Sequence, residues 1–274
     1  MVTAGQLTLL ILSISLLGAA TLVAWARLVG AWPGQRLLLR GLMAGGLAAA
    51  AGGLVWHAAM RGDWMPLGDN FQTLIWLGLL LGIFLVYLQV VRPLPGIESF
   101  ILPVIVAMLV GAAVFGKTRP HDYVAGQTWE WVHHAAAYTS AVAFAIAFAV
   151  SARYLVVNRR LRRKQPVSGP PLGSLERLEH LTLSSVTLGF ALLTVGLVMG
   201  LVIIIDQGWT RAVRGGTLAE PKIWLGILVW LVYAVVLHAP INPRFRGRRA
   251  AILSVLGFFL MLGVLVAVQF MGEV

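Results

Sequence analysis

Six histidines are the residues of this sequence best suited to do chemistry: His57, His121, His133, His134, His180 and His238. Imidazole is the usual axial ligand of non-covalently bound haem, and a six-coordinate iron takes two of them from opposite sides. The expected helix ends place His57 at the level of His133, and His180 at the level of His238, so two ligand pairs are possible. An alternative stays open for each, because a histidine near a helix end also fits the polar interface without any ligand.

Other metal and covalent chemistry finds little support in the sequence. The 274 residues include no cysteine, which excludes disulfides, thiolate ligands and covalent attachment of haem to this chain. The sequence contains neither an HExxH zinc motif nor a glycine-rich phosphate loop. Mid-span positions are nearly all apolar, which is not typical of a small-molecule permease.

The elements that must position these histidines are membrane helices. Hydrophobic residues make up 59% of the chain and charged residues 11%, whereas a soluble domain carries about 25% charged residues. A bilayer crossing needs about 20 mostly apolar residues. We expect eight spans, at residues 6–29, 37–60, 71–91, 99–116, 131–157, 180–205, 222–240 and 250–271. The predicted fold is an all-α polytopic membrane bundle, with a single integral membrane domain over residues 1–274.

The positive charges predict how these spans are oriented. Of the 21 Lys and Arg residues, 15 lie in or beside the first, third, fifth and seventh loops. Positively charged loops stay on the cytoplasmic side, so we expect both termini outside a bacterial-type cytoplasmic (inner) membrane. This distribution explains the net charge of +11 without a nucleic-acid partner. The basic run at residues 158–164 is either a topology signal or a contact for anionic lipid headgroups of the bilayer.

Aromatic residues gather in the expected outer loops. They include Trp64, Trp129, Trp131 and Trp209, with Phe71 and Tyr123 beside them. Flat aromatic walls suit the face of a porphyrin. The same residues also fit the interfacial belt of any membrane protein, so composition alone leaves both interpretations open.

Five segments, in the same order along the chain, resemble the cytochrome c assembly family that includes CcsA, CcmC and the HemX-type proteins. They are PLGDNFQTL at 66–74, WEWVHH with a later serine at 129–140, GF then LTVG and G at 189–200, WLVYAVVLH at 230–238, and RGRRA then GFF at 246–259. The resemblance covers roughly residues 50–270. It implies eight spans and a role in cytochrome c assembly.

The resemblance also implies particular ligands. In CcsA-type haem lyases, haem crosses the membrane and is presented outside to apocytochrome c. By the match, His133 is an outer ligand of haem b and His238 is an intramembrane ligand, both non-covalent. Ser140 follows at the family's spacing, which selects His133 over His134, whereas His57 matches less closely.

The sequence departs from the family in its tryptophan-rich outer loop, which would hold the haem plane. Glu220, Pro221 and Lys222 match the end of that loop. Thr217 and Ala219 stand where two tryptophans would be, and Trp209 remains upstream. A second outer histidine after the last span is also missing, a pattern that resembles the HemX-type branch.

Three functions therefore stay open. The first is haem handling or presentation at the outer face in cytochrome c biogenesis, with a CcsB/ResB-like membrane subunit as partner and apocytochrome c as client. The second is a HemX-like haem-binding regulator without lyase activity. The third is a non-catalytic structural subunit of a membrane complex. Because the tryptophan-rich loop is degenerate in this sequence, it stays open whether the chain takes part in a lyase reaction.

Overall fold

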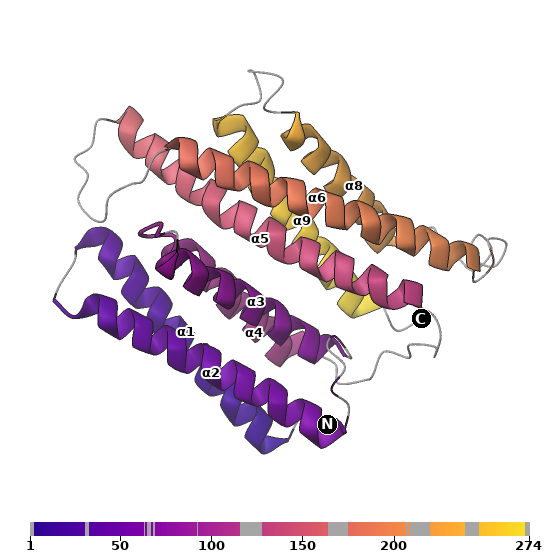
Figure 1. The fold of residues 1–274 in the computed structure, drawn as a ribbon, viewed down its shortest axis with the longest axis horizontal. Helices are drawn as coiled ribbons and strands as arrows, with labels where there is room; N and C mark the ends of the chain where they lie inside the picture. Colours follow the sequence, from indigo (N-terminus) through magenta and orange to yellow (C-terminus); the bar gives the residue numbers. More distant parts are fainter. Residues whose placement is uncertain are drawn as a thin grey trace. The chain divides into compact units, whose positions relative to one another are not determined.

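The computed structural model contains α-helices and no strands among the residues it describes (Figure 1). It describes residues 3–30, 33–62, 64, 67, 69–91, 93–115, 128–163, 175–206, 208, 220–238 and 247–271. The helices are α1 (Ala4–Val29), α2 (Gln35–Arg61), α3 (Asn70–Val90), α4 (Glu98–Phe115), α5 (Thr128–Arg162), α6 (Leu175–Asp206), α8 (Pro221–Leu237) and α9 (Arg248–Met271). The predicted all-α fold is confirmed.

Each predicted span corresponds to one of these helices. Seven of them are long and apolar enough to cross a membrane. The eighth, α8, has 17 residues, which at 1.5 Å per residue is about 25 Å, slightly less than the roughly 30 Å of hydrocarbon. Helix α5 is longer than predicted because its 35 residues include a basic last turn with Arg159, Arg160 and Arg162. The chain is a multi-pass membrane protein.

The contacts divide the chain into two compact units. Unit 1 comprises Met1–His121 and Val156–Leu175, and unit 2 comprises Asp122–Leu155 and Glu176–Val274. Unit 1 therefore holds α1 to α4, whereas unit 2 holds most of α5 together with α6, α8 and α9. The prediction of a single domain over residues 1–274 is not decided by this division and stays a prediction.

In unit 1, α1 packs along α2 and α4, while α3 packs along α4 and, less extensively, α2 (Figure 1). A Cβ atom added at Gly46 of α2 would lie 2.6 Å from Cγ of Leu17 in α1, so only glycine allows this approach. The Ser13 hydroxyl donates to the carbonyl of the same glycine at 2.8 Å. Small residues and one hydroxyl thus hold α1 against α2.

The other end of α1 is fixed to the start of α4 by polar contacts. The Arg27 guanidinium lies 2.9 Å from the Glu98 carboxylate, and both residues are buried. The Trp25 indole donates to the carbonyl of Ser99 at 2.9 Å. Buried charges in a membrane protein are costly unless they are paired, and this pair satisfies that requirement.

The centre of unit 2 is filled by two stacked rings. Phe144 of α5 and Tyr233 of α8 lie parallel, with ring centroids 3.7 Å apart, and both are fully buried. Glycines make room for them: a Cβ at Gly189 would lie 2.6 Å from Phe144, and a Cβ at Gly257 would lie 2.8 Å from Tyr233. Each of the four helices of unit 2 contributes one residue to this packing.

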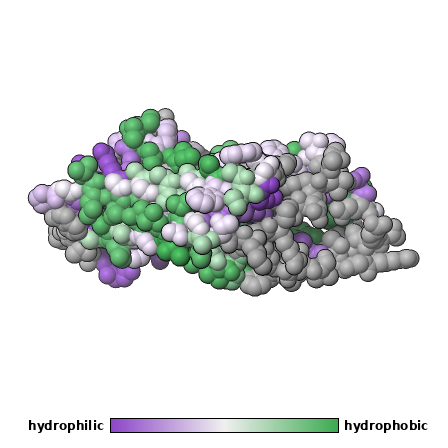
Figure 2. All heavy atoms as spheres, turned by 90° about the horizontal axis from the view of Figure 1, so that it is seen from below, coloured by the Kyte–Doolittle hydropathy of each residue, from purple (hydrophilic) through white to green (hydrophobic). Residues whose placement is uncertain are grey.

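The outer surface of the described helices is largely apolar. Figure 2 shows hydrophobic side chains over much of the coloured face, mixed with residues of intermediate hydropathy and a few hydrophilic patches. Large apolar residues such as Leu22, Leu37 and Ile83 are more than half exposed. A lipid-facing surface has this composition, because lipid solvates apolar side chains on all sides of the protein.

Candidate functional site

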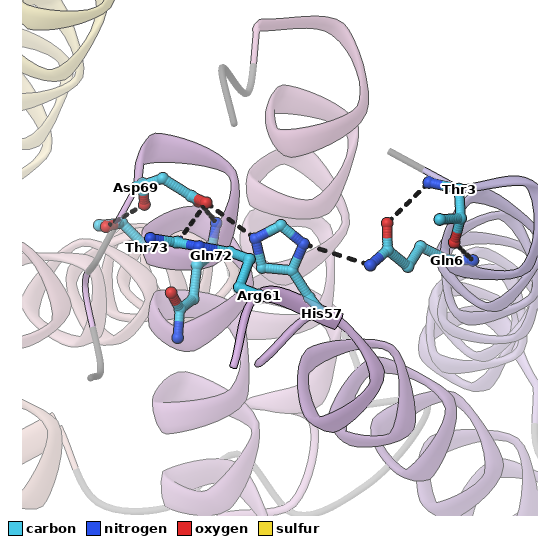
Figure 3. Close-up of polar contacts among 7 residues, drawn as sticks. All are labelled: Thr3, Gln6, His57, Arg61, Asp69, Gln72 and Thr73. Atoms are coloured by element: carbon cyan, nitrogen blue, oxygen red, sulfur yellow. Dashed lines mark hydrogen bonds and ion pairs between the residues drawn. The ribbon is translucent and has the colours of Figure 1, made fainter. Parts of the chain in front are cut away.

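His57 lies in a buried polar cluster of unit 1. Its Nε2 atom lies 2.8 Å from Oδ2 of Asp69, and the Arg61 guanidinium lies 2.7 Å from the same oxygen (Figure 3). Oδ1 of Asp69 accepts the backbone N–H of Gln72 at 2.6 Å, so Asp69 is the N-cap of α3. The Asp69 side chain is fully buried, and its two oxygens contact His57, Arg61 and the backbone N–H of Gln72. The cluster therefore ties α2 to the start of α3.

The second nitrogen of His57 faces Gln6 of α1. The Nδ1 atom lies 3.4 Å from Nε2 of Gln6, whose Oε1 accepts the backbone N–H of Thr3 at 2.8 Å. Thr3 and Gln6 form a capping box at the start of α1. Because Oε1 is used there, the amide NH₂ of Gln6 faces the ring and Nδ1 must accept. In this arrangement Nε2 of His57 donates a hydrogen bond to Asp69.

This geometry bears on the prediction that His57 binds haem. Iron binding through Nε2 would displace the Asp69 carboxylate, and binding through Nδ1 would displace the Gln6 amide. The ring is 4% exposed and packs against Phe71, with centroids 5.1 Å apart. In this structure His57 serves the packing of α1, α2 and α3.

His133 of unit 2 has a different environment. Its Nδ1 atom lies 2.7 Å from the carbonyl oxygen of Gly196 in α6. A carbonyl only accepts, so Nδ1 carries a proton, and in the neutral ring Nε2 then holds a lone pair. Within the described residues no hydrogen bond reaches Nε2 of His133, which is partly exposed. The ring is therefore held in the tautomer that binds a metal through Nε2.

His134, the next residue of α5, is arranged differently. Its Nδ1 atom lies 2.8 Å from the carbonyl of Glu130, one turn earlier in the same helix. Its ring lies edge-on to His133 and tilted against Tyr138. His134 is thus oriented by its own helix, whereas His133 is oriented by α6.

His238 and His180 lie at helix ends of unit 2 and are both exposed. His238 is the C-cap of α8, and its Nδ1 atom lies 2.7 Å from the carbonyl of Ala234. In the neutral ring, Nε2 of His238 is then an acceptor. No hydrogen bond or ring contact joins it to His180 in the described part of unit 2, so their pairing stays a prediction. The pairing of His57 with His133 also stays a prediction.

The predicted tryptophans are placed in part. Trp129 and Trp131 lie in the first turn of α5 and are 50% and 37% exposed. Trp129 precedes His133 by four residues, so the two share one face of the helix. Trp209 lies outside the described residues, as do Thr217 and Ala219 of the degenerate loop.

Sequence reasoning missed the partners that define each imidazole. Asp69 could have been found, because an aspartate three residues before Gln72 at the start of an apolar run is typical of a helix N-terminus. Nothing in the sequence pointed to Gln6, which is 51 residues from His57. The carbonyl of Gly196 carries no sequence signal for hydrogen bonding at all.

The histidine side chains of unit 2 fit the role of axial ligands to haem iron. Haem iron takes axial ligands from neutral imidazoles whose other nitrogen is hydrogen-bonded. His133, His134 and His238 each meet this condition, with Nδ1 donating to a backbone carbonyl. The porphyrin supplies the remaining ligands, so single histidines on different helices suffice.

The helices and histidines described above define a polytopic membrane protein with imidazoles set at helix ends. Residues 64–274 match the family described as Cytochrome C assembly protein. The chain belongs to this family, and the predicted resemblance is confirmed. His57 lies outside the matched residues, whereas His133 and His238 lie within them.

Several relatives share sequence with part of the chain. "Cytochrome c biogenesis protein CcsA" of Prochlorococcus marinus (strain NATL2A) is 34% identical over 116 residues, which are 42% of this chain and 34% of that protein. The protein of the same name from Synechococcus sp. (strain RCC307) is 34% identical over 103 residues, 37% of this chain and 31% of that one. That of Pyropia yezoensis is 30% identical over 108 residues, 39% of this chain and 32% of that one.

The chain thus matches about a third of the length of these relatives. No solved structure matches the chain.

Proposed function

We propose that this protein handles haem in cytochrome c biogenesis, and that His133 and His238 bind haem b non-covalently through Nε2. The observation that carries the proposal is the contact of Nδ1 with a backbone carbonyl, at 2.7 Å in both rings. His134 has a similar contact, and the family resemblance selects His133 over it. Membership in the cytochrome c assembly family supports the proposal. Relatives that carry the name cytochrome c biogenesis protein CcsA also support it.

The orientation of the helices gives the two histidines different places. With both termini outside, the N-terminal end of α5 with His133 lies at the outer face of a bacterial-type cytoplasmic membrane. The C-terminal end of α8 with His238 lies toward the inner face. The basic residues at the inner ends, Arg159 to Arg162 in α5 and Arg248 in α9, support this orientation.

The chain's own residues bind and orient the cofactor. His133 lies near the start of α5, and its ring contacts α6. Trp129 lies one turn earlier on the same face of α5. Trp129 and Trp131 would offer flat contacts to a porphyrin. Trp209, which lies outside the described residues, is proposed for the same role. When bound, haem supplies one-electron chemistry, and its axial ligands set the reduction potential.

The proposal ranks His57 and His180 below these two ligands. His57 uses both ring nitrogens within unit 1, so binding iron there requires a rearrangement. His180 is exposed near the start of α6, and its ligand role rests on the sequence pairing with His238.

A partner is part of the proposal. A membrane subunit similar to CcsB/ResB would supply what the tryptophan-poor loop lacks, and apocytochrome c would be the client. A second candidate function follows from the same loop. Because Thr217 and Ala219 stand at the positions of two stacking tryptophans, a haem-binding regulator without lyase activity is favoured over independent catalysis.

An absorption spectrum of the detergent-purified protein tests the proposal. We expect a b-type spectrum with a Soret shift on reduction, lost or altered in His133→Ala and in His238→Ala. His134→Ala is the matched control, because it removes the adjacent imidazole, and we expect it to leave the spectrum unchanged. A haem-free protein from haem-replete cells would overturn the proposal and favour a structural subunit.

Cytochrome c yield in a deletion strain separates the two haem functions. We expect the yield to fall if the protein presents haem to apocytochrome c, and complementation by His133→Ala to fail. A normal yield together with bound haem would contradict presentation and support the regulator.

A further inference from the structure

We infer that Gly200 of α6 positions the His133 imidazole: its missing side chain lets the ring reach the main-chain carbonyl of residue 196, so that Nδ1 holds a proton and Nε2 points to its ligand. This inference rests on the proposed role of His133 in binding haem. The side-chain position of residue 196 has no part in this role, because only its main-chain carbonyl is used.

The hydrogen bond to Gly196 depends on an accessible carbonyl in the middle of a helix. Helix α6 runs from Leu175 to Asp206, so Gly196 lies well inside it. Its carbonyl already accepts the helical N–H of Gly200, and its second lone pair accepts Nδ1–H of His133 at 2.7 Å. A ring from another helix must therefore approach closely to reach this oxygen.

Gly200 makes that approach possible. Helical side chains tilt toward the N-terminus and cover the preceding turn, so a side chain at position 200 would lie over the carbonyl of Gly196. A Cβ atom at Gly200 would lie 3.1 Å from Cε1 and 3.2 Å from Nδ1 of His133. Both atoms within reach belong to the imidazole, and no backbone atom of α5 is among them. The space left by Gly200 is thus occupied by the His133 ring.

Gly196 shows by contrast what ordinary helix packing looks like. A Cβ atom there would lie 3.5 Å from the backbone nitrogen of Ala137, which is normal van der Waals contact. Small residues often serve only to bring two membrane helices together. The small size of Gly196 has this role, because it lets α6 pack closely against Ala137 of α5. At Gly200, one turn later, the contact is with the candidate ligand.

The consequence concerns the strength of the ligand. A hydrogen bond from Nδ1–H to a carbonyl fixes the tautomer and makes the other nitrogen more basic. A more basic imidazole favours oxidised iron, so the contact lowers the reduction potential of a haem bound to Nε2. Loss of such an outer contact typically costs about 10- to 100-fold in metal affinity.

The test compares Gly200→Ala with Gly196→Ala, the same substitution one helical turn apart. We expect Gly200→Ala to weaken haem binding by roughly 10- to 100-fold and to raise the reduction potential. We expect Gly196→Ala to keep the affinity, the spectrum and the potential, because it keeps the carbonyl and meets only ordinary contacts. Equal values for Gly200→Ala and the wild-type protein would overturn the inference.

A readout without haem separates this inference from the proposed function. The ¹⁵N NMR shifts of His133 in the haem-free protein report which nitrogen carries the proton. We expect the Nδ1–H form in the wild-type and Gly196→Ala proteins, and its loss or averaging in Gly200→Ala. If the wild-type protein bound no haem but showed this pattern, the proposed haem function would be wrong, whereas the inference that Gly200 positions His133 would be supported. An Nε2–H form in the wild-type protein would overturn the positioning.

A double variant distinguishes positioning from general packing. If Gly200 acts through His133, adding Gly200→Ala to His133→Ala produces no further change in residual haem binding. A Gly200→Ala protein that folds only when His133→Ala is also present would support the same conclusion, since the methyl group then clashes with the ring. Failure to fold in both backgrounds would overturn it.

Discussion

His57 and His133 are both histidines at helix ends, and the two units of the molecule use them in opposite ways. In unit 1, His57 donates to the Asp69 carboxylate and faces the Gln6 amide, so both nitrogens have side-chain partners. In unit 2, His133 donates to a backbone carbonyl and keeps Nε2 as an acceptor. The comparison teaches that the partners of the two ring nitrogens distinguish a structural imidazole from a candidate ligand, together with burial: His57 is 4% exposed, whereas His133 is partly exposed.

The largest expected effect is on haem content. We expect His133→Ala to abolish or change the b-type spectrum, because it removes the nitrogen that faces the ligand. We expect His57→Ala to keep the spectrum, because its nitrogens serve Asp69 and Gln6. The Soret absorbance per protein, measured on the purified variants, checks both. An equal loss in His57→Ala would break the comparison and make His57 a ligand.

The next effect is on the stability of unit 1. Asp69→Ala leaves the buried ends of His57 and Arg61 without their shared carboxylate, and breaking a buried charge pair costs about 3–5 kcal/mol. The free energy of unfolding in detergent, measured by denaturant titration, checks this value. Asp69→Asn is the matched control, because asparagine also caps a helix and should cost less. A loss below about 1 kcal/mol for Asp69→Ala would show that Asp69 does not hold unit 1 together.

His57→Ala has a smaller effect on the same quantity. It leaves one oxygen of a fully buried carboxylate with fewer donors, which costs about 1–3 kcal/mol in unfolding free energy. Arg61 still pairs with that oxygen, so the loss should stay below that of Asp69→Ala. A His57→Ala protein as stable as the wild type would remove the structural role that sets His57 apart from His133.

The smallest effect concerns the capping box of α1. Gln6→Ala removes the bond from Oε1 to the Thr3 N–H and the weak contact with His57, which together cost about 1 kcal/mol. Thr8→Ala is the control, because its hydroxyl makes an exposed bond to the carbonyl of Ala4 in the same helix. Thermal unfolding of both variants measures the difference. If both lose the same stability, Gln6 does not link α1 to His57.

Much of the fold could be predicted because each span is recognisable from its own residues. The predicted span at 37–60 and the helix Gln35–Arg61 differ by at most two residues at either end. The end of α5 was less predictable: helix continues to Arg162 through residues too basic to lie in hydrocarbon, and apolar runs do not report such extensions. The division of the helices into two units has no signal in hydropathy either.

The residue types of the candidate site could be predicted from the sequence, but the hydrogen-bond partners of the histidine nitrogens could not. His133 and His238 were selected by resemblance, and family membership is confirmed, while their binding of haem stays a prediction. The clusters around the histidines were not predictable. His133 meets a carbonyl 63 residues away, and His57 meets an amide 51 residues away. Backbone carbonyls and glycines carry no side-chain chemistry that a sequence pattern could show.

The sequence by itself determined that this chain is a multi-pass helical membrane protein with histidines at helix ends. That is so because membrane insertion depends on the composition of about 20 neighbouring residues at a time. Only the tertiary structure decided which nitrogen of each imidazole is engaged. Hydrogen bonding requires donor and acceptor within about 3 Å, and the packing of α5 against α6, or of α2 against α1 and α3, is what brings those atoms together.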